Sequence, residues 1–159
     1  MHVPTDKAST LHAPRRFPQW TPLELAAALE GLCVLIGASM LIRILPFRKI
    51  AALSSRGPGG RYLNADASRL WVRVSCWAVE GWGRRVPWKA VCFQRGLALH
   101  IMLRRHFVNS VLHYGVTQSA SEGLKAHVWV SVGGTVVLGG ETSDDFACLA
   151  TFPQQERSG

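Results

Sequence analysis

The sequence predicts an α+β fold in which helices come first and an antiparallel sheet follows. Apolar residues recur with a helical period up to about Arg105. After that point they alternate with polar residues in three short segments, as is typical of strands. The dipeptide Gly133-Gly134 separates the last two segments and predicts a tight hairpin. Helices followed by hairpin-linked strands build a helical layer on one sheet.

Length and composition indicate a single folded domain. The chain has 159 residues, 48% of them hydrophobic, and six are tryptophans, which is enough to form one core. We expect residues 21–153 to form this domain, with N-terminal helices in 21–85 and the core in 88–153. The polar, proline-bearing segment 1–20 and the segment 154–159 are expected to be tails.

The first helix is predicted to begin at Pro22 and to run to about Leu45. The sequence "TPLE" places Thr21 at the N-cap, proline at the first helical position and Glu24 in a capping box. The apolar run "GLCVLIGASMLI" has twelve residues, whereas a bilayer span needs about 20. We therefore expect a buried helix, and contact of residues 22–45 with a membrane is the less favoured alternative.

Three more segments have a helical pattern. Pro46 ends the first helix and opens a short one, and Asn64 or Asp66 caps a longer one that ends near Gly83. The last is the segment 87–105, "PWKAVCFQRGLALHIMLRR". The strands are expected at "SVLHYGVT", "KAHVWVSV" and "TVVLGG", and the following "ETSDDFACLATF" is expected to return to the body of the domain.

The net charge of +8 favours acidic partners, such as a nucleic acid, an anionic membrane or an acidic peptide. The plainer alternative is a solvated basic surface. Nucleic-acid binding is not expected, because the sequence has no basic helix and no pattern of an aromatic platform.

Four cysteines are scattered along the chain, at Cys33, Cys76, Cys92 and Cys148. None belongs to a CxxC pair, and no histidine stands at metal-ligand spacing from them, so we expect neither a structural zinc site nor another cofactor. Unpaired cysteines fit a reducing cytoplasm. The N-terminus lacks the apolar segment of a cleavable signal peptide, which also favours a cytoplasmic location.

Cys92 lies in the first turn of the helix predicted at 87–105. On a helical wheel it faces inward with Gly96, opposite an arc that carries Arg95 and His100. Burial raises the pKa of a thiol, whereas a helix N-terminus lowers it. Cys92 alone is therefore either a core residue or a nucleophile, and a nearby imidazole would decide in favour of the nucleophile.

His127 is the candidate imidazole. In "KAHVWVSV", alternation places His127, Trp129 and Ser131 on one face of a strand and mostly valines on the other. A histidine at this position is either a satisfied core residue or the base for Cys92. A cysteine at the start of a helix and a histidine on a later strand can form a nucleophile–base pair across the fold. The two signals together favour catalysis.

Five motifs, taken together, carry a resemblance to a known family. They are "LELAAALEGLCVLIGASMLIRILPFRKIA", "VPWKAVCFQRGLALHIMLRR", "LHYGV", "KAHVWVSVGGTVVLGG" and "LATF". The chain resembles the lasso-peptide maturation protease in its stand-alone form, the protease half of the split B protein, over about residues 22–153. The pair "PWxxxC…ALxxxLRR" and "AHVWV…G.VV.GG" is specific as a set, although each piece alone is not.

The resemblance implies a bacterial cysteine peptidase with a transglutaminase-like or papain-like core. Such proteins remove the leader from a ribosomally made lasso precursor peptide, and a cyclase then closes the core peptide onto an acidic side chain. Cys92 matches the family nucleophile and His127 the family base. The segment before Cys92 is too short for the recognition domain of the fused form. We therefore expect a separate small leader-recognition protein as a partner, with the lasso cyclase as a further one.

The sequence does not decide which residue, if any, joins Cys92 and His127 as the third catalytic member. The family pattern places an acid about twelve residues after His127, where this chain has Gly139. A three-residue hairpin turn would put Glu141 on the face of His127, and a two-residue turn would point it away. We take Glu141 as the third member, with Asp144 or Asp145 as alternatives. A Cys–His dyad, with all three acids in a solvated loop, is the remaining alternative.

Two rival functions use the same residues. A Cys–His acyltransferase of the transglutaminase type would resolve the acyl-enzyme with an amine instead of water. A non-catalytic peptide-binding or scaffold module would use Cys92 for packing only, and its thiol would then be inert to iodoacetamide.

Overall fold

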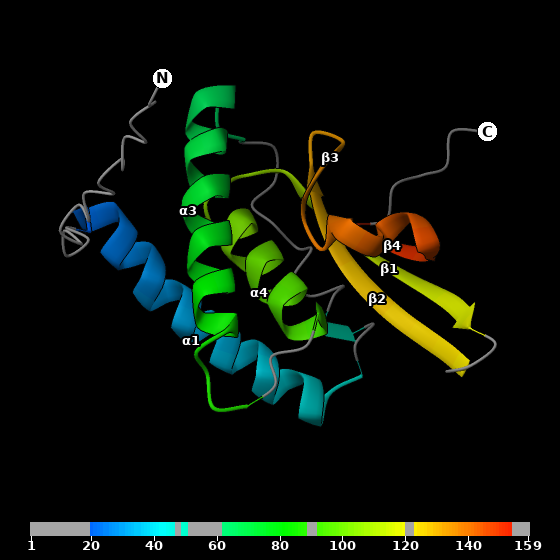
Figure 1. Cartoon of the computed structure of the whole chain (residues 1–159). Coiled ribbons are helices and arrows are strands. Elements are labelled where there is room, and N and C mark those ends of the chain that lie inside the picture. Colours follow the sequence, from blue (N-terminus) through cyan, green and yellow to red (C-terminus); the bar gives the residue numbers. More distant parts are fainter. Residues whose placement is uncertain (1–19, 47–48, 51–61, 89–91, 120–122, 154–159) are drawn as a thin grey trace, which may run out of the picture.

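The computed structural model describes residues 20–46, 49–50, 62–88, 92–119 and 123–153 (Figure 1). The predicted tails lie outside these ranges, apart from Trp20, as does most of the short helix expected after Pro46. Within the described ranges the chain forms helices first and an antiparallel sheet second. The predicted α+β fold class is therefore confirmed.

Three helices lie within the described ranges. They are α1 (Pro22–Ile44), α3 (Ala65–Gly83) and α4 (Cys92–Arg105). Thr21 caps α1 through the predicted capping box, because the Glu24 N–H donates to Thr21 Oγ1 and the Thr21 N–H donates to the Glu24 carboxylate. Asn64 caps α3 by accepting a hydrogen bond from the Ala67 N–H. The predicted starts of both helices are confirmed.

The described sheet contains four antiparallel strands in the order β3-β2-β1-β4. They are β1 (Ser110–Ser119), β2 (Gly123–Val132), β3 (Thr135–Leu138) and β4 (Ala147–Phe152). The 3-10 helix η1 (Gly140–Asp145) joins β3 to β4. The sequence predicts the first three strands but not β4, because "ACLATF" has no alternation of polar and apolar residues.

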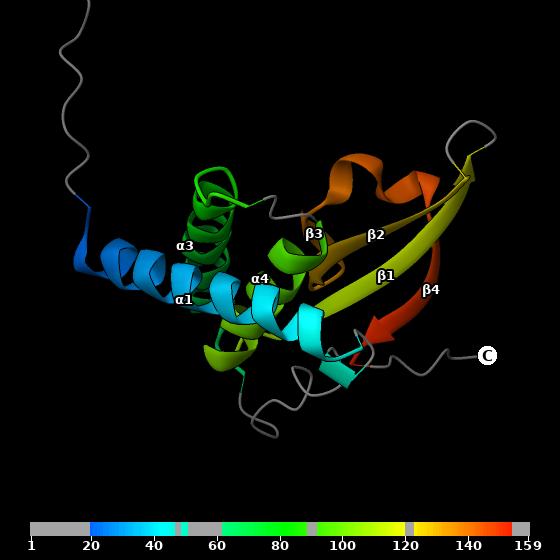
Figure 2. The ribbon, with the colours of Figure 1, turned by 90° about the horizontal axis from the view of Figure 1, so that it is seen from below.

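α4 lies between the other helices and the sheet (Figures 1 and 2). It contacts α1 and α3 on one side and β1 and β2 on the other. The largest fully buried side chains gather around it, including Leu97, Leu99, Met102, Leu103, Leu112, Val128 and Val130. Burial of this apolar surface is the main driving force for the fold.

The buried face of α4 is wider than the helical wheel predicts. His100 is fully buried and Arg104 is 9% exposed, although both share an arc with the exposed Arg105. The Ser110 hydroxyl lies 3.0 Å from His100 Nδ1, and Arg104 Nη1 donates to Asn109 Oδ1. These contacts around the start of β1 supply part of the hydrogen bonds that buried polar groups need, and His100 Nε2 has no hydrogen-bond partner among the described residues.

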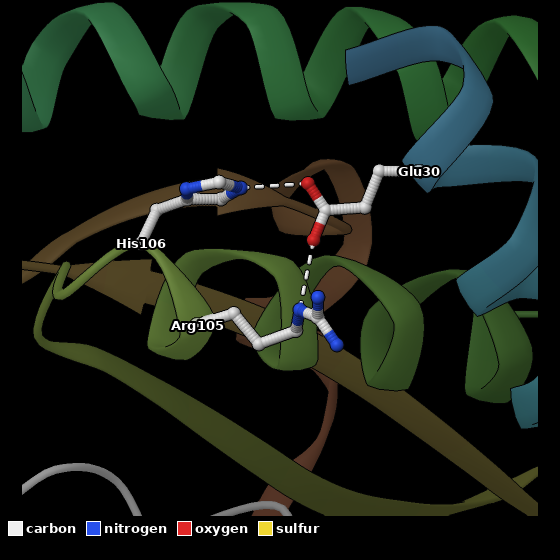
Figure 3. Close-up of polar contacts among 3 residues, drawn as sticks. All are labelled: Glu30, Arg105 and His106. Atoms are coloured by element: carbon white, nitrogen blue, oxygen red, sulfur yellow. Dashed lines mark hydrogen bonds and ion pairs between the residues drawn. The ribbon is translucent and has the colours of Figure 1, made fainter. Parts of the chain in front are cut away.

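Glu30 of α1 joins the three helices at the end of α4 (Figure 3). One carboxylate oxygen lies 2.9 Å from Nε of Arg105, and the other lies 2.6 Å from Nε2 of His106. The His106 ring in turn stacks on Trp71 of α3, with 3.5 Å between centroids. The Glu30 carboxylate, in the middle of α1, therefore points into the molecule and is paired with Arg105 and His106.

Candidate active site

Cys92 and His127 line the same cavity. Cys92 is the first residue of α4, and His127 lies in β2. The cavity has a volume of about 130 Å³ and is lined by Glu80, Cys92, Arg95, His127, Val128, Leu138, Gly139 and Glu141. These two residues, which are 35 positions apart in the chain, thus belong to the wall of one cavity.

Gly96 allows α4 to approach β2 closely. A Cβ added at this position would lie 2.6 Å from Val128 Cγ1 and 3.5 Å from Leu112 Cδ1. A larger residue would therefore push the helix away from the sheet. Since Gly96 is one turn beyond Cys92 and Val128 is next to His127, this contact holds the start of α4 close to the strand that carries His127.

The backbone of Gly139 orients the His127 ring. His127 Nε2 lies 2.8 Å from the Gly139 carbonyl oxygen. A carbonyl can only accept, so Nε2 carries the proton and, in the neutral ring, Nδ1 keeps its lone pair. His127 is thereby held in the tautomer whose free nitrogen can act as a base.

Gly139 adopts a backbone conformation that other residues avoid. Its φ angle is +74°, in the left-handed region that favours glycine. An added Cβ would lie 2.8 Å from the Val128 carbonyl oxygen and 3.2 Å from His127 Nε2. Glycine is thus required both for the conformation and for the close approach to the imidazole.

Two aromatic rings pack near His127. Its centroid is 5.1 Å from that of Phe146, just after η1, and 6.1 Å from that of Trp129 on β2. Such contacts restrict the ring to a small range of orientations. The imidazole is therefore held by packing on two sides as well as by its hydrogen bond.

The sequence leaves open whether the hairpin turn between β2 and β3 has two or three residues, and the observed register has features of both. The turn has two residues, because Val132 pairs with Thr135, and this alone would point Glu141 away from His127. A bulge follows, in which Val137 is the extra residue between the Ser131–Val136 and Val130–Leu138 pairs. β3 ends at Leu138, Gly139 turns the chain into η1, and Glu141 of η1 lines the cavity of His127.

The three acids that were candidates for the third member differ in position. Glu141 lies in the cavity wall and is exposed to solvent. Asp145 lies at the end of η1 and is exposed, and the side chain of Asp144 is outside the described part of the structure. The hydrogen-bond partner described for His127 Nε2 is the Gly139 carbonyl, so a catalytic role of any of the three acids stays a prediction.

A comparison with family models identifies the family to which the chain belongs. The model of the transglutaminase-like superfamily matches residues 32–151. The chain belongs to the transglutaminase-like superfamily. No curated protein and no solved structure matches the chain. Transglutaminase-like proteins are often cysteine peptidases or acyltransferases, which is the class of chemistry expected of a cysteine and a histidine in one cavity.

The cavity of this transglutaminase-like domain contains residues that the sequence analysis did not select. Glu80 comes from α3 and Arg95 from α4. The expectation that Arg95 lies on the arc opposite Cys92 is wrong, because both residues line the cavity. Three helical positions leave about 60° between them, which is close enough to share one wall. Glu80 and the Gly139 carbonyl had no comparable signal, because a sequence pattern shows neither which helix covers a cavity nor what a backbone carbonyl accepts.

The remaining cysteines have different surroundings. The Cys76 thiol donates to the Val137 carbonyl at 3.5 Å, and burial, with Glu80 as a lesser cause, raises the pKa of Cys76 to about 11. Cys76 is therefore a packing residue of the transglutaminase-like domain. Cys33 on α1 and Cys148 on β4 are exposed. Among the residues described, no group of three or more His, Cys, Asp or Glu side chains could hold a metal ion.

Cys148 lies near a second imidazole, that of His113. Its sulfur lies 4.0 Å from His113 Nδ1 and 3.6 Å from the Ala150 carbonyl. His113 Nε2 lies 2.7 Å from the Ser131 hydroxyl oxygen. The His113 ring stacks on Trp129 with 5.3 Å between centroids, and burial lowers the pKa of His113.

Proposed function

We propose that this transglutaminase-like protein is a cysteine peptidase that removes the leader from a lasso-peptide precursor. One observation carries the catalytic part of the proposal: Cys92 and His127 line one cavity, and the Gly139 carbonyl accepts a hydrogen bond from His127 Nε2. The substrate part rests on the sequence resemblance over about residues 22–153.

The first half of the reaction acylates Cys92. His127 Nδ1 takes the thiol proton, and the sulfur attacks the carbonyl carbon of the last leader residue. The oxyanion that forms accepts a hydrogen bond from the Cys92 backbone N–H, since Cys92 is the first residue of α4 and the first N–H groups of a helix lack intrahelical acceptors. The C–N bond then breaks, and the imidazolium proton passes to the leaving amine of the core peptide.

The second half of the reaction releases the leader. Neutral His127 takes a proton from water, and the hydroxide oxygen attacks the thioester carbon. The C–S bond breaks, the leader leaves with a carboxyl group, and the Cys92 sulfur regains its proton from the imidazolium. Arg95 lines the same cavity and carries donors from which a substrate carbonyl can accept.

A separate leader-recognition protein is part of the proposal. The cavity of about 130 Å³ is smaller than the ~300–1,000 Å³ of a typical small-molecule site, so it accommodates the scissile region rather than a long leader. A partner that holds both the leader and this protein raises the effective concentration of the scissile bond. The net charge of +8 supports attraction to an acidic leader or partner, and this attraction weakens as salt rises.

The acyltransferase alternative differs only in the acceptor. An amine that enters the cavity in place of water would take the acyl group from Cys92 and form a new amide. Product mass distinguishes the two: hydrolysis adds one water to the leader, whereas transfer joins the leader to the amine.

The proposal is tested by cleavage of a purified lasso precursor, followed by intact mass. With the candidate recognition protein present, the wild type should release the leader, and without it the rate should fall by about 10²-fold. Cys92→Ala should lower the rate by at least ~10³-fold with an unchanged circular dichroism spectrum, and Cys33→Ala should cleave normally. Normal cleavage by Cys92→Ala would disprove the mechanism. Equal rates with and without the recognition protein would leave a self-sufficient peptidase.

A further inference from the structure

A stripe of apolar side chains on α1 faces outward along the whole helix. We call it the α1 stripe; it consists of Leu25, Leu29, Cys33, Ile36, Met40 and Ile44, all exposed. The most apolar 18-residue window of the helix has a mean hydropathy of 2.2, and only 33% of it is buried inside the molecule. A helix on the surface of a soluble protein carries polar residues on its outer face. The α1 stripe is therefore a surface that something else covers.

The opposite face of α1 is fixed to the rest of the protein. A Cβ added at Gly31 would lie 3.0 Å from the Cβ of Ala78 on α3, and Trp82 Nε1 donates to the Ala28 carbonyl at 2.7 Å. The Glu30 contacts of Figure 3 add an ionic connection to α4. Leaving the protein to span a bilayer would expose this packed face and the Glu30 charge. α1 therefore lies along the surface, where Figure 2 shows it in front of α4.

The α1 stripe offers a partner only one side chain that can hydrogen-bond, the weakly polar thiol of Cys33. Between Glu24 and Arg43, every exposed side chain of α1 is aliphatic or contains sulfur. A protein interface carries about one hydrogen bond per 100–200 Å² and has a polar rim, whereas lipid acyl chains form none. The stripe thus matches lipid better than it matches a protein surface.

Tryptophan and arginine residues lie near both ends of the helix. Trp20 and Trp77 meet edge to face with 5.4 Å between centroids, beside a hollow of about 390 Å³ that Arg84 and Arg85 also line. Near the other end, the groove of about 180 Å³ beside Ile36 and Met40 is lined by Trp88 and Arg43. Tryptophan and basic residues are typical of the lipid headgroup region.

We propose that the α1 stripe seats this protein on an anionic membrane surface, with α1 lying in the plane of the membrane. The apolar side chains enter the boundary between headgroups and acyl chains, and the arginines and the net charge of +8 meet anionic headgroups. The proposal is independent of the catalytic one, since the α1 stripe contains none of the residues that line the cavity of Cys92.

Two exposed cysteines of the wild-type chain test the proposal directly. Cys33 lies in the α1 stripe, and Cys148 lies on β4. The protein is treated with a charged maleimide alone, with phosphatidylcholine vesicles and with vesicles that also contain phosphatidylglycerol, and each cysteine is followed by peptide mass. The anionic vesicles should slow labelling of Cys33 by about 10-fold and leave Cys148 within about 2-fold. Unchanged labelling of Cys33, or equal protection of both cysteines, would overturn the proposal.

Substitutions within and outside the stripe provide the second test. Leu29→Glu and Met40→Glu together place charges at positions that are 57% and 55% exposed, and the control Leu124→Glu changes a side chain that is 74% exposed on β2. The double variant should no longer sediment with anionic vesicles, whereas the control should sediment like the wild type, and both should cleave precursor normally without vesicles. Binding that survives the double substitution would refute the proposal.

If a protein covers the α1 stripe instead of lipid, the same experiments give different results. A second copy would appear as a dimer in light scattering without lipid, and as protection of Cys33 that depends on protein concentration. The candidate recognition protein would protect Cys33 in the absence of vesicles. Either result, together with no sedimentation on anionic vesicles, overturns the membrane proposal and leaves the peptidase proposal untouched.

Discussion

Two regions of the protein each bring a cysteine and a histidine to the same place, and their difference shows what a catalytic pair needs. Cys92 and His127 lie at the cavity, while Cys148 and His113 lie where β4 borders β1. Both imidazoles have a hydrogen-bond partner at Nε2, which is the Gly139 carbonyl for His127 and the Ser131 hydroxyl for His113.

The two partners constrain the imidazoles differently. A carbonyl only accepts, so His127 keeps its proton on Nε2, whereas a hydroxyl donates or accepts and allows either tautomer of His113. The sulfurs differ as well. Cys92 is the first residue of a helix, where its backbone N–H can stabilise an oxyanion, while Cys148 stands in an extended strand at the edge of the sheet. Closeness of thiol and imidazole is thus only one of several requirements.

The largest expected effect is the difference in leader cleavage between a substitution of His127 and one of His113. His127→Ala should lower leader cleavage by at least ~10³-fold, because the base is lost. His113→Gln should stay within about 3-fold of the wild type, because His113 faces a different thiol. Initial rates by mass spectrometry measure both, with circular dichroism as a control for folding. A similar loss in both variants would place the second pair in the reaction.

The second effect concerns the reactivity of the thiols. Because the pKa of Cys76 is raised to about 11, its thiolate is scarce near neutral pH, and iodoacetamide should modify it about 100-fold more slowly than the exposed Cys33. Cys92 should react faster than Cys33 at pH 6, since His127 can take its proton. Peptide mass against time gives all rates in one sample. If Cys148 proves as fast as Cys92, the tautomer argument above fails.

The third effect shows whether the Gly139 carbonyl or the Glu141 carboxylate orients His127. Gly139→Ala should slow cleavage by about 10–100-fold, because the new Cβ strains the backbone and disturbs the partner of His127 Nε2. Gly134→Ala is the matched control, since its φ is +83° but no atom lies within 4 Å of an added Cβ. It should lose similar stability and retain its activity.

Glu141→Gln completes that comparison. If the Gly139 carbonyl is sufficient to orient His127, the substitution should change the rate by less than about 5-fold. A loss of about 10²-fold or more would instead support Glu141 as the third catalytic member, and a loss only on substitution of Asp144 or Asp145 would assign that role to η1.

The smallest effect is on stability against acid. Burial, together with the charge of Arg104, lowers the pKa of His100 to about 3 from 6.5. The unfolded chain therefore binds more protons between these values, and stability is lost as pH falls from about 6.5, by at most ~1.4 kcal/mol per pH unit. His100→Asn should flatten urea midpoints measured from pH 7 to 4, and His113→Gln should flatten them less. Parallel curves for His100→Asn and wild type would contradict this.

Local signals in the sequence were sufficient for the starts of α1 and α3 and for the pairing of β2 with β3. The expectation that α1 is a buried helix is wrong, because only 33% of its apolar window is buried. The "TPLE" capping box and Asn64 mark helix starts that depend on neighbouring residues only. Gly133-Gly134 likewise specifies its own turn. Cys92 and His127 could be paired because helix and strand periodicity predict their faces, although their catalytic roles stay predictions.

The features that the sequence did not predict depend on tertiary contacts. β4 has no periodic pattern of its own and becomes a strand by pairing with β1. The bulge at Val137 and the 3-10 helix η1, which contains Glu141, have no signal in the composition. His100 is buried because the residues around the start of β1 cover α4. None of these can be read from spacing along the chain.

The carbonyl acceptor beside His127 has a consequence for how this site responds to its surroundings. A carboxylate in that position would lose its charge in acid and could be removed by one substitution, whereas the Gly139 carbonyl never ionises and is present whatever residue occupies the position. It also lacks the negative charge that would stabilise an imidazolium. The orientation of the base is therefore determined by a φ angle of +74°, and any ligand or variant that rotates this one peptide group acts on the base without touching a side chain.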